Sequence, residues 1–371
     1  MSPLFDLVRI LRLVIPAESH VHSRIGRTVN IGKQKMKELR EIRIGVLLFS
    51  AAVLLASSVS GQERPEINSS YRAPRTADGS PDISGIWRND TLTPLERPAR
   101  FADQEFLTVE EVAEIERSNS EALARDNEPG GRRTVGGRSW GSGYNEFWQD
   151  PREVVHTRRT SMIADPSSGL VPTRLAAEER AKWLVTNRTM SHETMSPYSR
   201  CITRGMPGSM IPNTYNTGNH IFQIPGYVVI LYEMVREPRI IPLDDRPPID
   251  PKIGQWMGDA RGRWEGETLV VETTHFTEKG WIIPNQNAGR MHGVPVSRAL
   301  KLVERFTRVA EGILDWQVRV EDPSVYTQPW TLELPLRRDQ DYTIYEYACH
   351  EGNRAVTGIL GGARHVERRD P

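Results

Sequence analysis

This chain has no excess of charge of either sign. Its 371 residues include 48 Lys and Arg and 48 Asp and Glu, so the formal net charge at pH 7 is zero. Proteins that bind nucleic acid or acidic membranes through their overall field carry a surplus of basic residues. The balance argues against such partners, and the sequence predicts no nucleic-acid ligand.

Long apolar runs are also scarce. The clearest, residues 44–59, spans roughly 16 residues, whereas a membrane-spanning helix needs about 20. Lys37, Arg40 and Arg43 precede the run, and Ser60 and Gly61 follow it. This order of basic, apolar and small residues is typical of a secretory signal peptide. An uncleaved membrane anchor is the alternative interpretation.

We therefore expect a signal peptide over residues 36–61, with cleavage near Gly61. The mature protein would then be periplasmic or secreted, without a stable membrane span after cleavage. Because a signal peptide normally starts near its basic residues, Met36 is the expected start of the native product. Residues 1–35 are not expected to belong to it.

Cysteine is nearly absent, with Cys201 and Cys349 as the only two. Two cysteines cannot form a disulfide-dense scaffold, but an even number in an exported chain favours one bond. We therefore predict a Cys201–Cys349 disulfide. Two buried free thiols are the alternative.

Most motifs that identify an enzyme are missing too. The chain has no P-loop, no H-E-x-x-H and no C-x-x-C-H. The segment 205–209 lacks the spacing of a nucleophile elbow. The sequence therefore predicts neither a cofactor nor a metal site, and leaves open whether the protein is an enzyme.

Alternating apolar and polar residues dominate the second half of the chain. Trp316, Val318 and Val320 share one strand face, and Leu332 and Leu334 repeat the pattern. We expect these side chains in the core, with Gln317, Arg319 and Glu333 outside. Turn signals such as Glu265-Gly266 and Glu311-Gly312 separate the segments.

The pattern predicts a mainly β fold, an antiparallel β-barrel of lipocalin-like shape, with a β-sandwich as the alternative. The antiparallel β domain is expected over residues 201–371. Residues 227–232 are nearly all apolar, which indicates a strand buried on both faces. Residues 342–350 are expected to form a further strand.

Residues 62–200 are expected to form a helical and irregular N-terminal portion packed on the barrel. Thr108 and Glu111 form a capping box ahead of a helix that reaches about Arg125. A second short helix is expected over residues 173–184. The Gly-rich stretch 128–144 between them is expected to be a loop.

Four titratable residues lie on otherwise apolar strand faces, and they are the candidate ligand-binding residues: His275, Glu304, Glu346 and His350. If those faces line a barrel cavity, burial would shift their pKa values toward general acid–base chemistry. Ordinary salt bridges at a strand rim are the alternative. The loop 280–297, which includes Trp281 and His292, is a second candidate for ligand contact or else a solvated insertion.

Several segments resemble a large family of exported bacterial proteins of unknown function. They are Asp78-Gly-Ser-Pro-Asp-Ile-Ser-Gly-Ile-Trp87, Pro225-Gly-Tyr-Val-Val-Ile-Leu-Tyr-Glu233, Gly262-Arg-Trp-Glu-Gly-Glu-Thr-Leu-Val-Val-Glu-Thr-Thr274, Val303-Glu-Arg-Phe-Thr-Arg308 and Tyr345-Glu-Tyr-Ala-Cys-His-Glu-Gly-Asn353. The resemblance covers most of residues 75–365. It implies export and a shared β-rich fold, and it implies no activity or catalytic residue.

The leading functional hypothesis is an exported protein that binds a small molecule in a cavity of its β-barrel. The first alternative is a general acid–base enzyme, a hydrolase, isomerase or lyase, acting through His350, Glu346 or Glu304. The second alternative is an interaction protein of the cell envelope. A cavity lined by carboxylates or imidazoles would favour the enzyme, and a barrel filled with side chains would favour the interaction protein.

Overall fold

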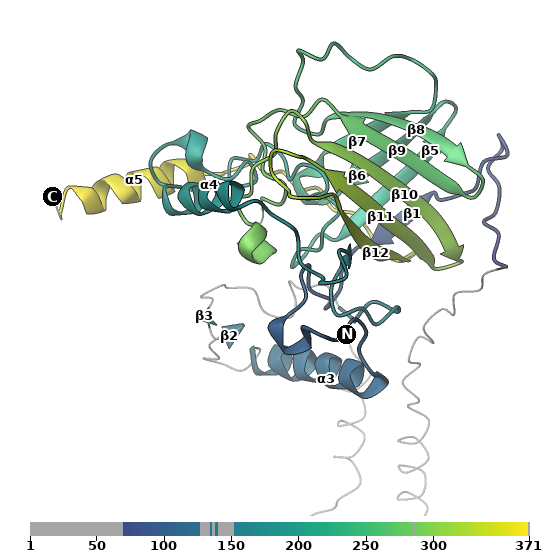
Figure 1. Cartoon of the computed structure of the whole chain (residues 1–371), viewed down its shortest axis with the longest axis horizontal. Helices are drawn as coiled ribbons and strands as arrows, with labels where there is room; N and C mark the ends of the chain where they lie inside the picture. Colours follow the sequence, from purple (N-terminus) through teal and green to yellow (C-terminus); the bar gives the residue numbers. More distant parts are fainter. Residues whose placement is uncertain (1–69, 127–133, 136–137, 140–151, 285, 370–371) are drawn as a thin grey trace, which may run out of the picture. The chain divides into compact units, whose positions relative to one another are not determined.

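The described residues fold around one antiparallel β-sheet that curls into a barrel. The computed structural model describes residues 70–126, 134–135, 138–139, 152–284 and 286–369. Nine strands form the nearly closed barrel (Figure 1), in the order β7-β6-β5-β1-β12-β11-β10-β9-β8. The prediction of an antiparallel β-barrel is therefore confirmed. The expected signal peptide and most of the Gly-rich stretch 128–144 lie outside the described residues.

The barrel strands are β1 (Gly85–Arg88), β5 (Gly218–Ile224), β6 (Tyr227–Tyr232), β7 (Pro238–Pro242), β8 (Asp259–Glu265), β9 (Thr268–Thr274), β10 (Lys301–Ala310), β11 (Ile313–Glu321) and β12 (Trp330–Arg338). Strand β4 (Ile163–Asp165) pairs with β12, and β2 (Thr134–Val135) pairs with β3 (Arg138–Ser139). The helices are α3 (Val109–Asp126), α4 (Leu175–Thr186) and α5 (Ala355–Glu367). Short 3-10 turns are η1 (Ala99–Phe101), η3 (His192–Thr194), η4 (Met234–Arg236) and η5 (Gln286–Met291).

The period-two alternation fixes the register of β10, β11 and β12. Trp316, Val318, Leu332 and Leu334 are all buried. Trp316 lies opposite Leu334, and Val318 lies opposite Leu332. The outward-facing neighbours are Gln317, Arg319 and Glu333. This arrangement is the one predicted, because a slip of one residue would have moved the whole apolar set to the outside.

Strand β6 corrects one prediction. Val228, Ile230 and Tyr232 are buried, but Tyr227 and Val229 on the opposite face are only partly covered. The strand is therefore not buried on both faces. Its continuous apolar run reflects an outer barrel face that is apolar although it is only partly covered.

The N-terminal portion contributes to the barrel as well as packing on it. Strand β1 lies between β5 and β12, so the barrel uses residues from both sides of the expected boundary at 200. Helix α3 begins where predicted: the Thr108 hydroxyl accepts from the Glu111 N–H at 3.2 Å, and the Glu111 carboxylate accepts from the Thr108 N–H at 2.8 Å. Helix α4 matches the second predicted helix to within two residues.

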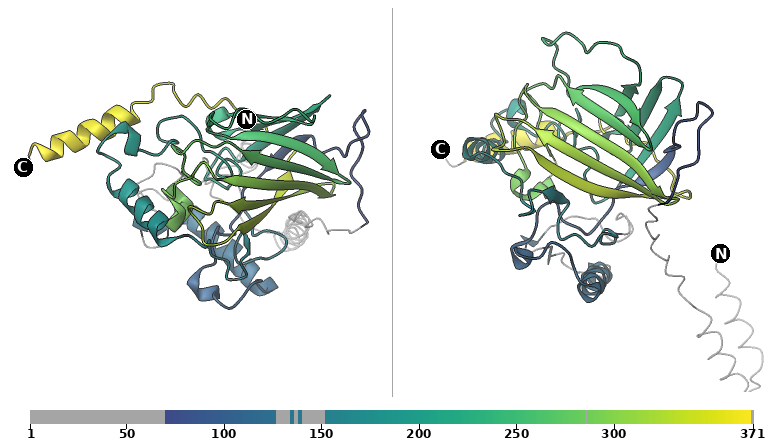
Figure 2. Two further views of the ribbon diagram at one scale, coloured as in Figure 1. Left: turned by 45° about the horizontal axis from the view of Figure 1, so that its top comes forward. Right: turned by 45° about the vertical axis from the view of Figure 1, so that its right-hand side comes forward.

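Residues 342–350 do not form the predicted strand. Both neighbouring positions of β12 are already taken by β1 and β11, so no ladder remains for the segment there. Its groups bind a side chain instead: the buried Glu233 carboxylate accepts from the Tyr342 hydroxyl at 2.7 Å and from the Tyr345 N–H at 3.2 Å. Apolar and polar residues do alternate in this segment, but the segment is an extended tail outside the sheet. After it, α5 projects away from the barrel (Figure 2).

An ion pair crosses the interior of the barrel. Arg239 of β7 donates to Glu304 of β10, with 3.0 Å between Nη1 and Oε1, and both side chains are buried. The Trp316 indole N–H of β11 donates to the same carboxylate at 3.1 Å, and Arg239 also donates to the Thr273 hydroxyl of β9 at 2.6 Å. Burial by itself would lower the pKa of Arg239, but the negative charge of Glu304 raises it above its usual value. Four strands therefore meet at one charged centre.

The barrel has a seam between β7 and β8, and this ion pair connects strands on the two sides of that seam. Strands β7 and β8 end the strand order, and no ladder joins them within the described residues. They still approach closely, because a side chain at Gly262 of β8 would place its Cβ 2.8 Å from Ile241 of β7 and 2.8 Å from Leu243. Glycine at 262 thus allows side-chain packing to close a seam that hydrogen bonds do not.

Glu304→Leu is expected to destabilise the fold by about 3–5 kcal/mol, because it leaves the Arg239 guanidinium buried without its counter-charge. The double variant Arg239→Met/Glu304→Leu should recover most of that loss, since both charges are then gone. Urea denaturation of the wild type, both single variants and the double variant measures the coupling. Additive effects of the two substitutions would contradict the assigned role.

Asp315 on the outer face of β11 is half-buried, and its Oδ1 has no hydrogen-bond partner. Burial, with a further contribution from the negative charge of Glu333, raises the pKa of Asp315 to about 6. A carboxyl group whose pKa is raised on folding favours the folded state when protonated. Ionisation of Asp315 therefore removes stability as the pH rises from about 4 to about 6.

Asp315→Asn should accordingly stabilise the protein above pH 7, by up to about 3 kcal/mol, and give no gain near pH 4 where the wild-type carboxyl is neutral. Thermal melting at both pH values measures the difference. An equal shift at the two pH values would show that the charge of Asp315 is not responsible.

Candidate functional site

The structure separates the four candidate ligand-binding residues. Glu304 lies inside the barrel in the ion pair with Arg239. His275 follows β9, where its Nδ1 shares a hydrogen bond with the Thr274 hydroxyl at 2.7 Å. Glu346 and His350 lie on the C-terminal tail, and both are exposed. These side chains therefore do not converge on one cavity.

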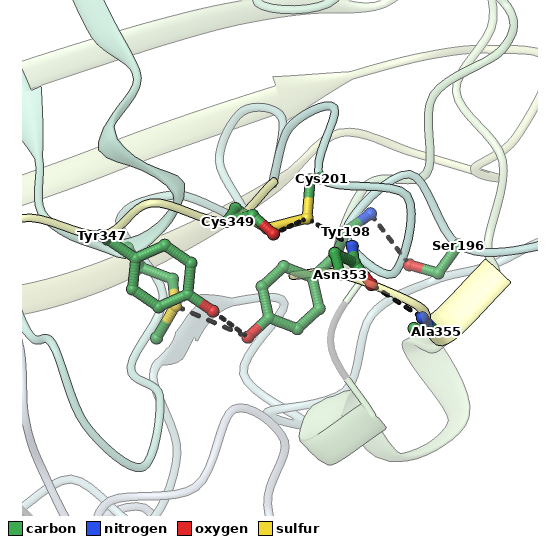
Figure 3. Close-up of a disulfide and its surroundings, with 8 residues drawn as sticks. Ser196, Tyr198, Cys201, Tyr347, Cys349, Asn353 and Ala355 are labelled. Atoms are coloured by element: carbon green, nitrogen blue, oxygen red, sulfur yellow. Dashed lines mark hydrogen bonds between the residues drawn. A yellow bond between two sulfur atoms is a disulfide. The ribbon is translucent and has the colours of Figure 1, made fainter. Parts of the chain in front are cut away.

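The predicted disulfide is present and pins the tail to the body of the protein. Cys201 and Cys349 are bonded, with 5.5 Å between their Cα atoms and 148 residues between them along the chain. Figure 3 shows Tyr198 and Tyr347 beside the bond, with their hydroxyl oxygens 3.4 Å apart. Closing a loop of this length stabilises a fold by about 5 kcal/mol through the entropy of the unfolded chain. The bond therefore fixes both the tail and the segment that follows Cys201.

That segment forms one wall of a pocket at the end of the barrel where β6 and β9 end and β8 and β10 begin. Its other walls come from the residues before β8 and from the loop between β9 and β10. The pocket is lined by Pro197, Thr203, Arg204, Gly205, Met206, Trp256, Phe276, Gly280, Trp281, Pro284 and Val296. Its volume is about 10 Å³, which is room for about one water molecule. Only a small group, such as one carboxylate of a ligand, can enter without movement of the side chains around it.

Arg204 is the charged residue of this pocket, and it is only 2% exposed. Its Nη2 donates to the Ile211 carbonyl at 3.0 Å, and its Nε has no partner. No carboxylate of the described residues forms an ion pair with it. Burial lowers the pKa of Arg204 to about 10, and the groups that oppose this shift are the phenols of Tyr198, Tyr347 and Tyr215. The guanidinium is therefore a buried cation without a counter-charge.

The backbone around Arg204 is locally unusual. Gly205 has φ of +62°, a conformation that glycine adopts without strain. The next residue, Met206, packs on the end of β6, where the Tyr232 hydroxyl donates to its Sδ at 3.4 Å. Gly205 and Met206 thus hold the segment with Arg204, which forms one wall of the pocket, against the mouth of the barrel.

The Glu237 carboxylate does not line the pocket itself, but it binds Thr203, which does. The Thr203 hydroxyl donates to Glu237 at 2.5 Å, and the Gly205 N–H donates to the Thr203 hydroxyl at 2.8 Å. Burial raises the pKa of Glu237, although the Thr203 bond partly offsets this. Glu237 is thus engaged with Thr203 and leaves the charge of Arg204 unbalanced.

Aromatic side chains form the apolar walls of the pocket. Trp281 and Phe276 are buried there, and Trp256 lies on the approach to β8. The ring of Trp281 meets His292 edge-on, with 5.3 Å between the ring centroids. Both residues belong to the loop 280–297, so one part of the predicted ligand-contact loop does line the pocket. Arg290 of the same loop instead pairs with Glu96 and Glu178.

Sequence reasoning missed Arg204. The spacing of residues 205–209 excludes a nucleophile elbow, and it does not by itself point to the neighbouring Arg204. A signal was present, because Arg204 lies between Ile202 and Met206 in a stretch with two glycines and a proline. A cation in an apolar, turn-rich segment next to a cysteine indicates a buried charge that needs a partner.

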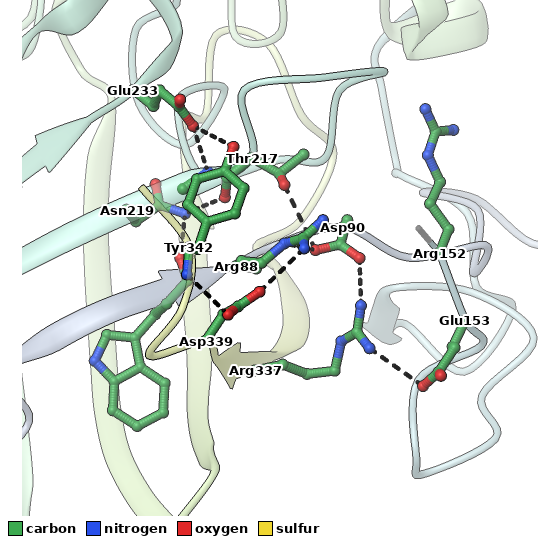
Figure 4. A network of polar contacts seen from close by, with 12 residues as sticks. Arg88, Asp90, Arg152, Glu153, Thr217, Asn219, Glu233, Arg337, Asp339 and Tyr342 are labelled. Atoms are coloured by element: carbon green, nitrogen blue, oxygen red, sulfur yellow. Dashed lines mark hydrogen bonds and ion pairs between the residues drawn. The ribbon is translucent and has the colours of Figure 1, made fainter. Parts of the chain in front are cut away.

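A second polar cluster lies near the C-terminal end of β12 and holds the N-terminal portion in place (Figure 4). The buried Asp90 carboxylate binds Arg88 at 2.9 Å and also pairs with Arg337. Arg88 further pairs with Asp339 at 3.2 Å, and Arg337 with Glu153 at 3.3 Å. Each charged group named here has an oppositely charged partner, which distinguishes this cluster from the surroundings of Arg204.

The described part of the chain has neither a metal-binding group of side chains nor a helix suited to a membrane. No group of three or more His, Cys, Asp or Glu side chains there is placed to hold a metal ion. No helix there combines the length and the apolar character needed to cross a membrane. Comparisons of the chain with protein families, with curated proteins and with solved structures found no match.

Proposed function

We propose that this protein binds a small anionic molecule in the pocket at the mouth of its barrel. The single observation that carries the proposal is the buried guanidinium of Arg204, which lines the pocket without an acidic partner. A buried unpaired charge is costly, and an incoming anion would supply the missing charge and hydrogen bonds. Arginine also presents a planar fork of donors that matches a carboxylate.

The walls around Arg204 indicate the rest of the ligand. Trp256, Phe276 and Trp281 offer apolar surface, and aromatic rings bind flat apolar groups well. A ligand with a carboxylate that enters beside Arg204 and a small aromatic or apolar body that stays at the open side would contact both features. The disulfide holds the Arg204 segment in place before binding, so little ordering is needed when the ligand arrives.

The mouth is favoured over the barrel interior because the interior is occupied. Phe306, Trp316 and the Arg239–Glu304 pair are buried against one another there. Binding is favoured over acid–base catalysis because His350 and Glu346 are exposed on the tail, away from the pocket lining. The ligand site proposed here therefore uses residues different from those of the sequence-based hypothesis.

Sodium benzoate, with the neutral benzamide as a matched probe, tests the site. Titration followed by the indole N–H signals in NMR should show that the wild type binds benzoate more tightly than benzamide. Arg204→Gln should weaken benzoate binding by about 10- to 100-fold, the loss expected for a charge-assisted hydrogen bond, and remove the preference for benzoate.

Arg308→Gln is the matched control. Arg308 is also a buried arginine that donates to backbone carbonyls, those of Asp82 and Glu311, but it does not line the pocket. The substitution should leave the preference for benzoate unchanged even if it costs stability. Equal binding of the two probes by the wild type, or equal losses in the two variants, would refute the site.

We further propose that the protein acts in the periplasm or outside the cell. The disulfide supports this location, because such bonds persist in oxidising compartments. The order of basic, apolar and small residues over 37–61 and the resemblance to exported bacterial proteins support it as well.

Protein isolated from its native host with thiols trapped during lysis should have Cys201 and Cys349 already bonded. Mass spectrometry should find its first residue close to Gln62, because signal peptidase cleaves after the small residues that follow an apolar run. Free thiols on a chain with an intact N-terminus would show that the protein stays in the cytoplasm.

A further inference from the structure

The outer side of strands β5, β6 and β7 is apolar throughout, and we call it the apolar face. It consists of His220, Phe222, Ile224, Tyr227, Val229, Leu231, Pro238, Ile240 and Pro242. The ladder registers arrange these residues in rows across the three strands, with Phe222 beside Val229 and Val229 beside Ile240 at the centre. The face contains no Asp, Glu, Lys or Arg.

The rest of the barrel exterior is different. Strands β8 to β12 alternate in the same way, but their outward positions are rich in charge. These outward residues include Arg261, Arg263, Glu265, Glu272, Lys301, Arg305, Arg319, Glu321, Glu333 and Arg337. The absence of charge on the apolar face is therefore a local property and does not describe the whole barrel.

Part of the apolar face is open within the described part of the chain, whereas Pro242 at one edge is buried. Phe222 is 40% exposed, Ile224 is 51% exposed and Ile240 is 61% exposed. Moving one such side chain fully out of water contributes about 1.5–3 kcal/mol of favourable free energy to a contact. A contiguous patch of this kind on one side of a barrel marks a contact surface.

The imidazole of His220 does not charge the face at neutral pH. Its ring lies 3.8 Å from that of Phe222, and burial lowers the pKa of His220 below its ordinary value. Charge begins only at the rim, where Arg246 donates to the Tyr227 hydroxyl at 2.8 Å and lies over its ring. An apolar centre with a polar rim is the composition of a protein–protein contact.

The absence of charge also indicates which partner fits. A twofold contact places each residue of a face near the same face of its copy, so any charge near the axis would meet its own like charge. This face has none, and it can therefore pack on itself. A face that docks a charged partner would instead carry complementary charges, as outward positions on β8 to β12 do.

The size of the face sets the strength of the contact. Three strands about 4.8 Å apart and about 20 Å long cover roughly 300 Å² of flat area in each copy. Two such faces lie below the standard size of about 1,600 Å² for a stable interface. The contact is therefore expected to be weak and to form only at high protein concentration.

We propose that two copies of this chain associate through their apolar faces, around a twofold axis near Val229. Both barrel mouths then stay free, because the apolar face lies on the side of the barrel and the pocket at its end. The proposal is independent of the ligand at Arg204.

Sedimentation velocity of the purified full chain, from about 1 μM to about 300 μM, tests the association. The wild type should shift from monomer to dimer across this range. Ile240→Glu should weaken the association by more than about tenfold, because each copy then buries an unpaired carboxylate. Phe222→Lys, with a charge of the opposite sign on β5, two strands away from Ile240, should do the same.

Ile253→Glu is the matched control, since Ile253 is 52% exposed in the loop before β8 and lies outside the apolar face. It should dimerise like the wild type, and all variants should keep the wild-type circular dichroism spectrum. A wild type that stays monomeric throughout would overturn the proposal. So would equal weakening by Ile240→Glu and Ile253→Glu, or a monomer that cosediments with phosphatidylcholine vesicles through the same residues.

Discussion

The ion pair between Arg239 and Glu304 is the interaction on which the barrel depends. A barrel closed by a complete ladder needs no further connection between its first and last strands. Here β7 and β8 meet without a ladder in the described structure, so closure relies on packing across the seam and on contacts through the centre. The pair supplies such a contact, because Arg239 reaches from β7 to partners on β9 and β10.

A charged centre also changes what the barrel can be used for. Burying two ions costs several kcal/mol each, and the cost is offset only when the geometry and the surrounding hydrogen bonds are good. Trp316 and Thr273 provide those bonds, which leaves the middle of the barrel committed to structure. The proposed ligand site lies instead at the mouth, where loops that have no role in the sheet carry Arg204 and the tryptophans.

Much of the fold could be predicted from the sequence, and the reasons are local. The alternation in β11 and β12 reports which face is buried, because side chains of a strand point alternately to its two sides. The helix starting at Val109 could be predicted from Thr108 and Glu111, since both partners of a capping box lie within one turn. The disulfide could be predicted from two cysteines in a chain whose sequence predicts export.

The candidate site could not be predicted in the same way, because it depends on contacts that are distant in the sequence. Alternation over 342–350 predicts a strand, but whether a strand forms depends on a free neighbour in the sheet, and β12 has none. Glu304 was recognised as a polar residue on an apolar face, but its partner Arg239 lies 65 residues away. Arg204 and Trp281 meet only after the barrel has brought its end loops together.

The spacing of the two cysteines along the chain determines when the wall of the pocket is fixed. Cys349 lies 148 residues after Cys201. The segment that carries Arg204 can therefore be locked only after these residues have been synthesised and Cys349 has met an environment that oxidises thiols. A nascent or reduced chain has the same residues but an untethered pocket wall. The redox state of the compartment then decides whether this wall is held in place.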